Sequence, residues 1–202
     1  MKYNIPILFI IFRRPEIAAK SFEQIRKAKP TTLYIACDGA RDNTPGEDLL
    51  VEKTKKKILD MIDWPCDVKT LFQDKNLGCS LGVYTAINWL FENEEMGIIL
   101  EDDCMVQNSF FQFMAEMLMR YKDDERIGNV DGANYIKYEI ETSYCFSKYK
   151  STNGWATWKR AWTNMDLNMK WRNTVYKEDI IRNTGYKQKD IQYWKYRIKL
   201  ID

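Results

Sequence analysis

The sequence predicts an α/β fold built around a mostly parallel β-sheet, and three observations support this class. Short apolar runs rich in β-forming residues alternate along the chain with segments of helical periodicity, which is typical of βαβ units. Several of these runs end directly in polar residues, as parallel strands do at the ligand-binding edge of a sheet. The 202 residues, 45% of them hydrophobic, suffice for one domain with a sizeable core, with or without a small extension.

The N-terminal part of the chain contains two predicted strands, each followed by a predicted helix. The run 5–12 is continuously apolar and predicts a buried strand, which Pro15 ends. Residues 16–29 carry apolar side chains at helical spacing. The run 31–37 predicts a second strand, and residues 48–62 predict an amphipathic helix with a lysine-rich outer face.

The alternation continues through the middle of the chain. Residues 67–72 predict a third strand, residues 81–93 a helix, and residues 97–100 a fourth, buried strand. We expect a further helix from Asn108 or Ser109 to about residue 121, and a short strand at residues 127–130. The predicted strands should run parallel, because helical connections between strands favour right-handed crossovers.

Composition excludes several classes of function. A net charge of +2, with both signs interspersed, gives no nucleic-acid-binding signature. The absence of histidine excludes Ser-His-Asp and Cys-His catalysis and zinc sites with histidine ligands. Five cysteines without a CxxC pair argue against a disulfide framework. The short apolar N-terminus ends at Arg13 and Arg14, and no run approaches a membrane span, so we expect a cytoplasmic location without an integral membrane segment.

Three consecutive carboxylates, Glu101, Asp102 and Asp103, follow the buried run 97–100. Like charges repel, and a cation among them would make their clustering tolerable. Mg²⁺ or Mn²⁺ prefers oxygen ligands and commonly takes one or two protein carboxylates together with substrate phosphates. The alternative is a polar loop in which Asp103 serves as a helix N-cap.

Other predicted strand ends also carry candidate binding groups. Arg14 could contact a phosphate or a nucleotide edge, or could simply be solvated. Asp38 before Gly39 could accept a hydrogen bond from a nucleobase or ribose, or could form a turn. The loop with Asn76 and Gly78 favours the turn interpretation. If the strands are parallel, these groups and the three carboxylates meet at one edge of the sheet.

Five segments, in this order, resemble the GT-A glycosyltransferases: "IPILFIIFRRPE", "TLYIACDGARD", "QDKNLGCSLGVYTAINWLF", "GIILEDDCMVQNSFFQFMAEML" and "NGWATWKRAW". The chain is similar to the family-2 type and, more closely, to the N-acetylglucosaminyltransferase I family. The resemblance spans about residues 4 to 162 and depends most on the "EDD" motif. It implies a Rossmann-like, three-layer α/β/α fold of the nucleotide-diphospho-sugar transferase superfamily.

The resemblance also implies roles for individual residues. Asp103, the last acid of the DxD-type motif, would be the ligand of Mn²⁺ or Mg²⁺. Asp38 would read the base, usually uracil, so a UDP-sugar is the expected donor. Gly154 and Trp155 would form part of the wall on the acceptor side. The donor-binding residues implied in this way are Arg14, Asp38, Gly39, Asn76, Gly78, Glu101 and Asp102.

The catalytic base that related enzymes carry beside a later tryptophan has no counterpart here, so the catalytic residues stay unassigned. Asp63-Trp64 precedes the acidic motif, and four later acids lack the expected context: Asp166, Glu178, Asp179 and Asp190. We expect residues 1–142 to form the nucleotide-sugar-binding core. Residues 143–202 would form an aromatic-rich acceptor-side region with a helical tail, and we expect the chain to end before the acceptor segment is complete.

The favoured hypothesis is a metal-dependent transferase that moves a sugar to a hydroxyl acceptor, such as a growing glycan in a bacterial-type cytoplasm. One alternative is a non-catalytic or truncated nucleotide-sugar-binding module of the same fold. Another is a nucleotidyltransferase, against which the lack of glycine in "FRRPEIAAKSF" counts. The sequence leaves open the sugar, the acceptor, the stereochemical outcome and the oligomeric state.

Overall fold

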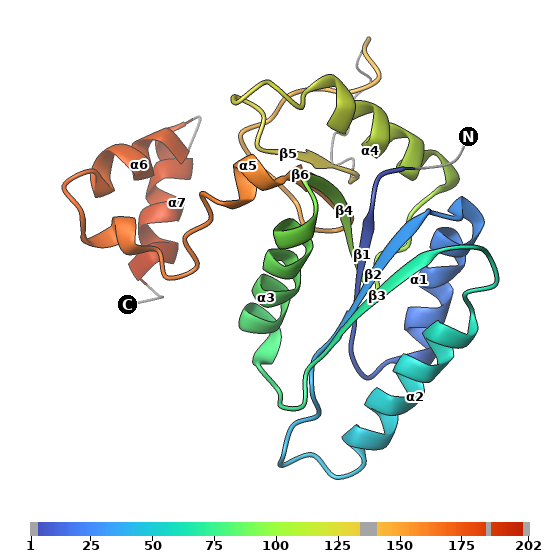
Figure 1. The fold of residues 1–202 in the computed structure, drawn as a ribbon. Helices are drawn as coiled ribbons and strands as arrows, with labels where there is room; N and C mark the ends of the chain where they lie inside the picture. Colours follow the sequence, from blue (N-terminus) through green and yellow to red (C-terminus); the bar gives the residue numbers. More distant parts are fainter. Residues whose placement is uncertain (1–3, 134–140, 185–186, 200–202) are drawn as a thin grey trace. The chain divides into compact units, whose positions relative to one another are not determined.

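A computed structural model describes residues 4–133, 141–184 and 187–199 (Figure 1). The chain divides into two compact units. The first comprises Met1–Tyr135 and Ser151–Asn164, and the second comprises Ile136–Lys150 and Met165–Asp202. Each unit therefore consists of two segments, and the segments of the two units alternate along the sequence.

The first unit contains a six-stranded sheet with the strand order β3-β2-β1-β4-β6-β5. Strands β1, β2, β3 and β4 are parallel, whereas β6 is antiparallel to both β4 and β5. This confirms the predicted α/β class with a mostly parallel sheet. The strands are β1 (Ile7–Ile11), β2 (Thr32–Cys37), β3 (Asp67–Phe72), β4 (Met96–Glu101), β5 (Asn129–Asp131) and β6 (Trp155–Trp158).

Helices cover both faces of this sheet, which gives the three layers (Figure 1). The helices of the first unit are α1 (Pro15–Ala28), α2 (Glu47–Asp60), α3 (Gly78–Asn93), α4 (Asn108–Arg120) and the short α5 (Lys159–Trp162). Phe9 packs on Phe22 of α1, with ring centroids 5.6 Å apart. The adjacent strand residue Leu8 belongs to a core cluster with Leu90 of α3. Because neighbouring residues of a strand face opposite sides, α1 and α3 cover opposite faces.

The sequence pattern explains why these helices dock where they do. In α1 the buried residues recur at helical spacing, and Pro15 occupies the first turn, where its missing N–H costs nothing. Helix α4 begins at Asn108 with Gln107 at the N-cap position, so neither Asn108 nor Ser109 is the cap that the sequence predicted. For the same reason Asp103 is not a helix N-cap, so that part of the alternative interpretation is wrong, although Asp102 and Asp103 do lie in a polar turn after β4.

Strand β6 was not predicted as a strand. It pairs with β4 through Ile99 and Trp155 and with β5 through Val130 and Ala156. All four residues of β6 are buried, so the segment has no alternation of apolar and polar residues from which a strand could be recognised.

The second unit is mainly helical after residue 165. It contains the 3₁₀ helix η1 (Lys170–Asn173) and the helices α6 (Lys177–Thr184) and α7 (Gln188–Lys199), in line with the predicted helical tail. Lys195 of α7 pairs with Glu178 of α6 at 2.6 Å. In the part of the chain that the structure describes, no helix combines the length and apolar character needed to cross a membrane.

Candidate functional site at the carboxyl edge of the sheet

The register of the parallel strands brings the predicted site residues to one edge of the sheet. Ile11 of β1 lies beside Cys37 of β2, and Ile10 lies beside Glu101 of β4. The residues that follow these strand ends, Arg14 and Asp102 among them, therefore leave the sheet on the same side. Ligands of open α/β sheets bind at this edge.

Arg14 connects the first strand to the acidic motif. Its guanidinium donates to Asp102 from Nε, at 3.2 Å from Oδ2, and from Nη2 to Oδ1. Nη2 also donates to Asp103 Oδ2 at 3.1 Å. Hydrogen bonding to Asp102 is the main cause that raises the pKa of Arg14, so this side chain is a permanent cation. Two of the three adjacent carboxylates thus share a cation supplied by the protein.

The three carboxylates lie in different surroundings. Asp102 is only 3% exposed, whereas the side chain of Asp103 is 57% exposed. Glu101 is half-buried, and burial, followed by the charges of Asp103 and Asp102, raises its pKa. Asp103 is therefore the carboxylate most available to a ligand, and Asp102 is a structural counter-ion of Arg14.

A buried hydroxyl fixes the turn that carries these acids. Ser21 of α1 is 2% exposed, and its Oγ donates to the main-chain oxygen of Asp102 at 2.8 Å. The turn is closed by Cys104 N, which donates to Glu101 O at 3.0 Å. The sequence analysis did not identify Ser21, although a polar residue on the apolar face of an amphipathic helix was the available signal.

Asp38 links the end of β2 to the N-terminus of α3. Its carboxylate accepts from the main-chain N–H groups of Gly39, Leu77 and Gly78 at 2.8–3.1 Å. Asn76 Nδ2 donates back to Gly39 O at 2.7 Å. A negative charge is favourable at a helix N-terminus, so Asp38 stabilises the start of α3. Both carboxylate oxygens of Asp38 accept hydrogen bonds from these main-chain groups. The contact of Asp38 with a nucleobase stays a prediction.

Gly39 is required by the close approach of the two loops. A Cβ atom at this position would lie 2.5 Å from the main-chain carbon of Lys75. Any larger residue would push the 73–77 loop away from Asp38. The structure therefore brings together four of the predicted donor-binding residues, Asp38, Gly39, Asn76 and Gly78, as one hydrogen-bonded pair of loops.

A second ion-pair cluster lies beside the strand ends. Glu47, at the start of α2, accepts from Arg13 Nη1 at 2.7 Å and from Arg41 Nη2 at 2.6 Å. The hydrogen bond from Arg41 is the main cause that lowers the pKa of Glu47 to about 2. The cluster fixes the loop between β2 and α2 and gives Arg13 a structural partner.

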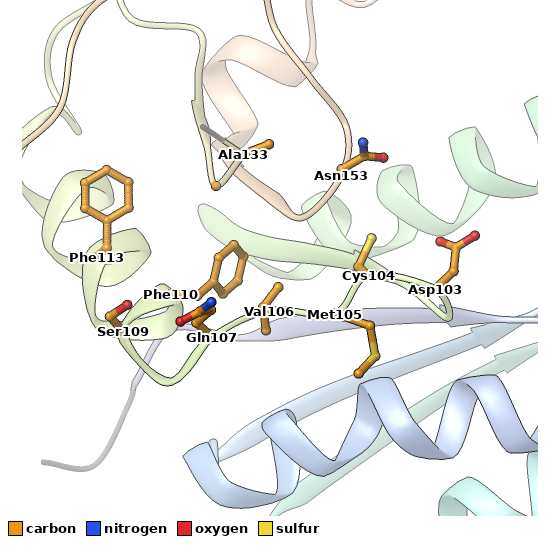
Figure 2. A pocket seen from close by; sticks show the side chains of 11 residues that line it. Asp103, Cys104, Met105, Val106, Gln107, Ser109, Phe110, Phe113, Ala133 and Asn153 are labelled. Atoms are coloured by element: carbon orange, nitrogen blue, oxygen red, sulfur yellow. The ribbon is translucent and has the colours of Figure 1, made fainter. Parts of the chain in front are cut away.

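A pocket of about 650 Å³ adjoins Asp103 (Figure 2). Its lining comes from the loop after β4, the first turns of α4, the end of β5 and the residue that precedes Gly154. The lining residues are Asp103, Cys104, Met105, Val106, Gln107, Ser109, Phe110, Phe113, Gly132, Ala133 and Asn153. Gly132 N donates to Gly154 O at 3.0 Å, which joins two parts of this wall.

The two residues predicted on the acceptor side are placed differently from one another. Gly154 has a φ of +75°, and a Cβ added there would lie 3.3 Å from Phe110 and Val106, two residues of the pocket. The side chain of Trp155, by contrast, is buried in the core cluster with Leu90 and Ile99. Gly154 thus packs closely against the pocket residues Phe110 and Val106. Trp155 packs in the core instead.

The described residues offer one exposed carboxylate for a metal, and no complete cage. Within residues 4–133, 141–184 and 187–199, no three His, Cys, Asp or Glu side chains are arranged to hold a metal ion. Mg²⁺ and Mn²⁺ sites that use one or two carboxylates and complete their coordination with substrate phosphates and water need no such cage. Asp103 fits that kind of site, and Glu101 is the nearest further carboxylate in the sequence that does not pair with Arg14, since Asp102 does.

Comparisons with known proteins give fold-level information only. No protein-family model matches the sequence, and a search of curated proteins finds no match. Similar solved structures include the 4-diphosphocytidyl-2C-methyl-D-erythritol synthase from Anaerococcus prevotii DSM 20548, with 9% sequence identity and a TM-score of 0.44. The similarity covers 98% of this chain and 100% of that one. At this level of similarity, only the residues of the site itself bear on the function.

Proposed function

We propose that this chain binds a nucleotide-diphosphate sugar, preferably a UDP-sugar, and transfers the sugar to a hydroxyl acceptor with the help of Mn²⁺ or Mg²⁺. One observation carries the proposal: an exposed carboxylate, Asp103, stands at the carboxyl edge of a parallel sheet beside an open pocket. Charged groups converge at this edge from two strand ends that are far apart in the sequence.

Asp103, together with Glu101, would hold the metal, and the diphosphate of the donor would complete the coordination. The bound ion would neutralise the negative charge that develops on the diphosphate as it leaves. Arg14 already contacts Asp103 at 3.1 Å, so its guanidinium lies within reach of a phosphate that binds there. The residue that accepts the acceptor's proton is unassigned.

Calorimetric titration of UDP tests the proposal. Binding should require Mn²⁺ and should be lost when excess EDTA is added. Asp103→Asn should weaken metal-dependent UDP binding at least about tenfold, because it removes the charged ligand. Asp123→Asn is the matched control, since the Asp123 side chain is 88% exposed and lies in the turn after α4. Equal UDP affinity of Asp103→Asn and the unmodified protein, with Mn²⁺ present, would contradict the proposal.

Titrations with UDP and with a nucleoside triphosphate, together with assays of sugar transfer and UDP-sugar hydrolysis, separate the two alternatives. Metal-dependent UDP binding without sugar transfer to any acceptor, and without slow hydrolysis of UDP-sugars, would identify a non-catalytic binding module. Binding of a nucleoside triphosphate that is much tighter than binding of UDP would favour a nucleotidyltransferase. In that case Arg13 and Arg14 would be the nearest cations for the additional phosphate, after Arg13 leaves Glu47.

A further inference from the structure

The pocket beside Asp103 has a size and a lining that restrict what it can bind. Its volume of about 650 Å³ lies within the range of small-molecule sites. Asp103 lies at one end of the row of labelled side chains in Figure 2, and Phe113 lies at the other. A ligand in the pocket would therefore extend along the loop after β4 to the first turns of α4, with one end at the proposed donor and metal site.

The lining provides no cation for an anionic ligand. Among the described residues of the pocket, Asp103 alone carries a charge at neutral pH. The nearest described cation, Arg14, pairs with Asp102 and Asp103 and does not line the pocket, so a phosphate or carboxylate among the lining residues would lose its hydration without a cation to pair with.

The floor of the pocket is apolar and held in place. Phe110 is buried, and its ring is confined by two glycines: an added Cβ would lie 2.4 Å from the ring at Gly132 and 3.3 Å from it at Gly154. Met105 also lines the pocket, and its Sδ lies 3.4 Å from the Ser21 hydroxyl of α1. The side chains of Gln107 and Ser109, both exposed, contribute neutral hydrogen-bonding groups. An apolar floor with a few neutral polar groups suits a ligand with one apolar and one hydroxyl-bearing face.

We propose that this pocket binds the acceptor, and that the acceptor is an uncharged glycoside. Its C–H face packs on Phe110, and its hydroxyl groups form hydrogen bonds with Gln107 and Ser109. Anionic acceptors, such as sugar phosphates, uronic acids and lipid-linked phosphates, bind more weakly because the lining offers them no cation. The inference rests on the transferase function proposed above, because that function places the donor sugar at Asp103.

The test measures binding directly and requires no turnover. The ¹³C-methyl NMR signals of methionine are recorded while four neutral phenyl glycosides are titrated: glucoside, galactoside, mannoside and N-acetylglucosaminide. At least one of them should shift the methyl signal of Met105, assigned through Met105→Leu. The signal of Met119, which is exposed on α4 outside the pocket, should stay in place. The corresponding phenyl uronide should bind on the order of tenfold more weakly.

A pair of charge variants identifies the cause of this selectivity. Gln107→Lys places a cation in the pocket and should remove most of the preference for the neutral glycoside. Gln112→Lys is the control, because it makes the same change on an exposed position of α4 that does not line the pocket. If the preference for the neutral glycoside disappears equally in Gln107→Lys and Gln112→Lys, the assignment to the pocket is overturned. It is also overturned if the preference persists in both variants.

The outcomes separate this inference from the proposed function. If UDP and Mn²⁺ bind through Asp103 but none of the four neutral glycosides shifts Met105, the inference is wrong and the proposed function is unaffected. A uronide that binds as tightly as its neutral counterpart would also overturn the inference. If the neutral glycosides shift Met105 but UDP does not bind, the pocket's ligand class is supported and the transferase function is contradicted.

Discussion

Replacement of Arg14 by glutamine should destabilise the fold, because it leaves the Asp102 carboxylate in a buried position without its cation. Asp102 is 3% exposed and receives two N–H groups from the guanidinium, one of them at 3.2 Å. Glutamine is too short, and has too few N–H donors, to reproduce the two hydrogen bonds from Nε and Nη2 to the Asp102 carboxylate. The expected effect is therefore a stability effect, separate from any role of Arg14 in binding phosphate.

The magnitude follows from the exposure of the two partners. Removing one member of a fully buried ion pair costs about 3–5 kcal/mol, whereas exposed pairs contribute about 0–1 kcal/mol. The Arg14 side chain is 44% exposed and that of Asp102 only 5%, so solvent screens one partner and not the other. We expect Arg14→Gln to lower the free energy of unfolding by about 1–3 kcal/mol, between these limits.

Urea unfolding of a double-mutant cycle measures this interaction. The four proteins are the unmodified chain, Arg14→Gln, Asp102→Asn and the double variant. Because Arg14→Gln should cost much less when Asp102 is already neutral, the coupling should be about 1–2 kcal/mol. If the two single effects add to within about 0.5 kcal/mol, the argument that Asp102 is a buried counter-ion of Arg14 is refuted.

Three further predictions concern the same edge of the sheet. Ser21→Ala should cost about 1–3 kcal/mol in urea unfolding, because the main-chain oxygen of Asp102 loses its buried donor. Glu47, whose pKa is lowered to about 2 by Arg41, stabilises the fold above the ordinary carboxyl pKa of 4.5. This contribution should be lost as the pH falls from about 4.5 towards 2, and thermal unfolding of Glu47→Gln should lack that loss. Glu101→Gln should raise the melting temperature at pH 7, because burial raises the pKa of Glu101. The gain should shrink as the pH falls towards 4.5 and disappear well below 4.5, where the carboxyl is protonated in both the folded and the unfolded state.

Matched substitutions at exposed positions serve as controls. Ser80→Ala, on an exposed position of α3, should change stability by less than about 0.5 kcal/mol. Glu116→Gln, on an exposed position of α4, should leave the melting temperature nearly unchanged at both pH values. If Ser21→Ala costs no more than Ser80→Ala, the hydroxyl does not hold the acidic turn. If Glu101→Gln lowers the melting temperature at pH 7, burial of its charge is not the dominant effect.

The parallel part of the sheet could be predicted because its signal is local. Each of the strands β1, β2 and β4 is a nearly continuous apolar run, and the helices after β1 and β2 have apolar residues on one face. Strand β6 could not be predicted in the same way. Its partners β4 and β5 lie earlier in the sequence, and all four of its residues are buried, so no alternation of apolar and polar residues marks it. The preceding Asn153-Gly154 indicates a turn but not the strand that follows.

The sequence predicted where the candidate site lies, at the carboxyl edge of the sheet. It did not predict which of the site's side chains contact each other. Parallel strands imply that Arg14 and the three acids share an edge, and the register confirms it. Which acid pairs with Arg14 depends on the turn after β4, where Asp102 points into a buried position and Asp103 stays exposed. That difference arises from tertiary packing, including the bond from Ser21, and has no local sequence signal.

The most direct test of the central claim is to locate a bound Mn²⁺ ion through its paramagnetic effect on methionine methyl signals. Met105 is two residues from Asp103, whereas Met119 lies about 16 Å further along α4 than Asn108. Addition of Mn²⁺ in the presence of UDP should broaden the Met105 signal strongly and the Met119 signal much less, and Mg²⁺ should broaden neither. Asp103→Asn should abolish the broadening. A Met105 signal that stays sharp while UDP and Mn²⁺ are bound would contradict a nucleotide and metal site at Asp103.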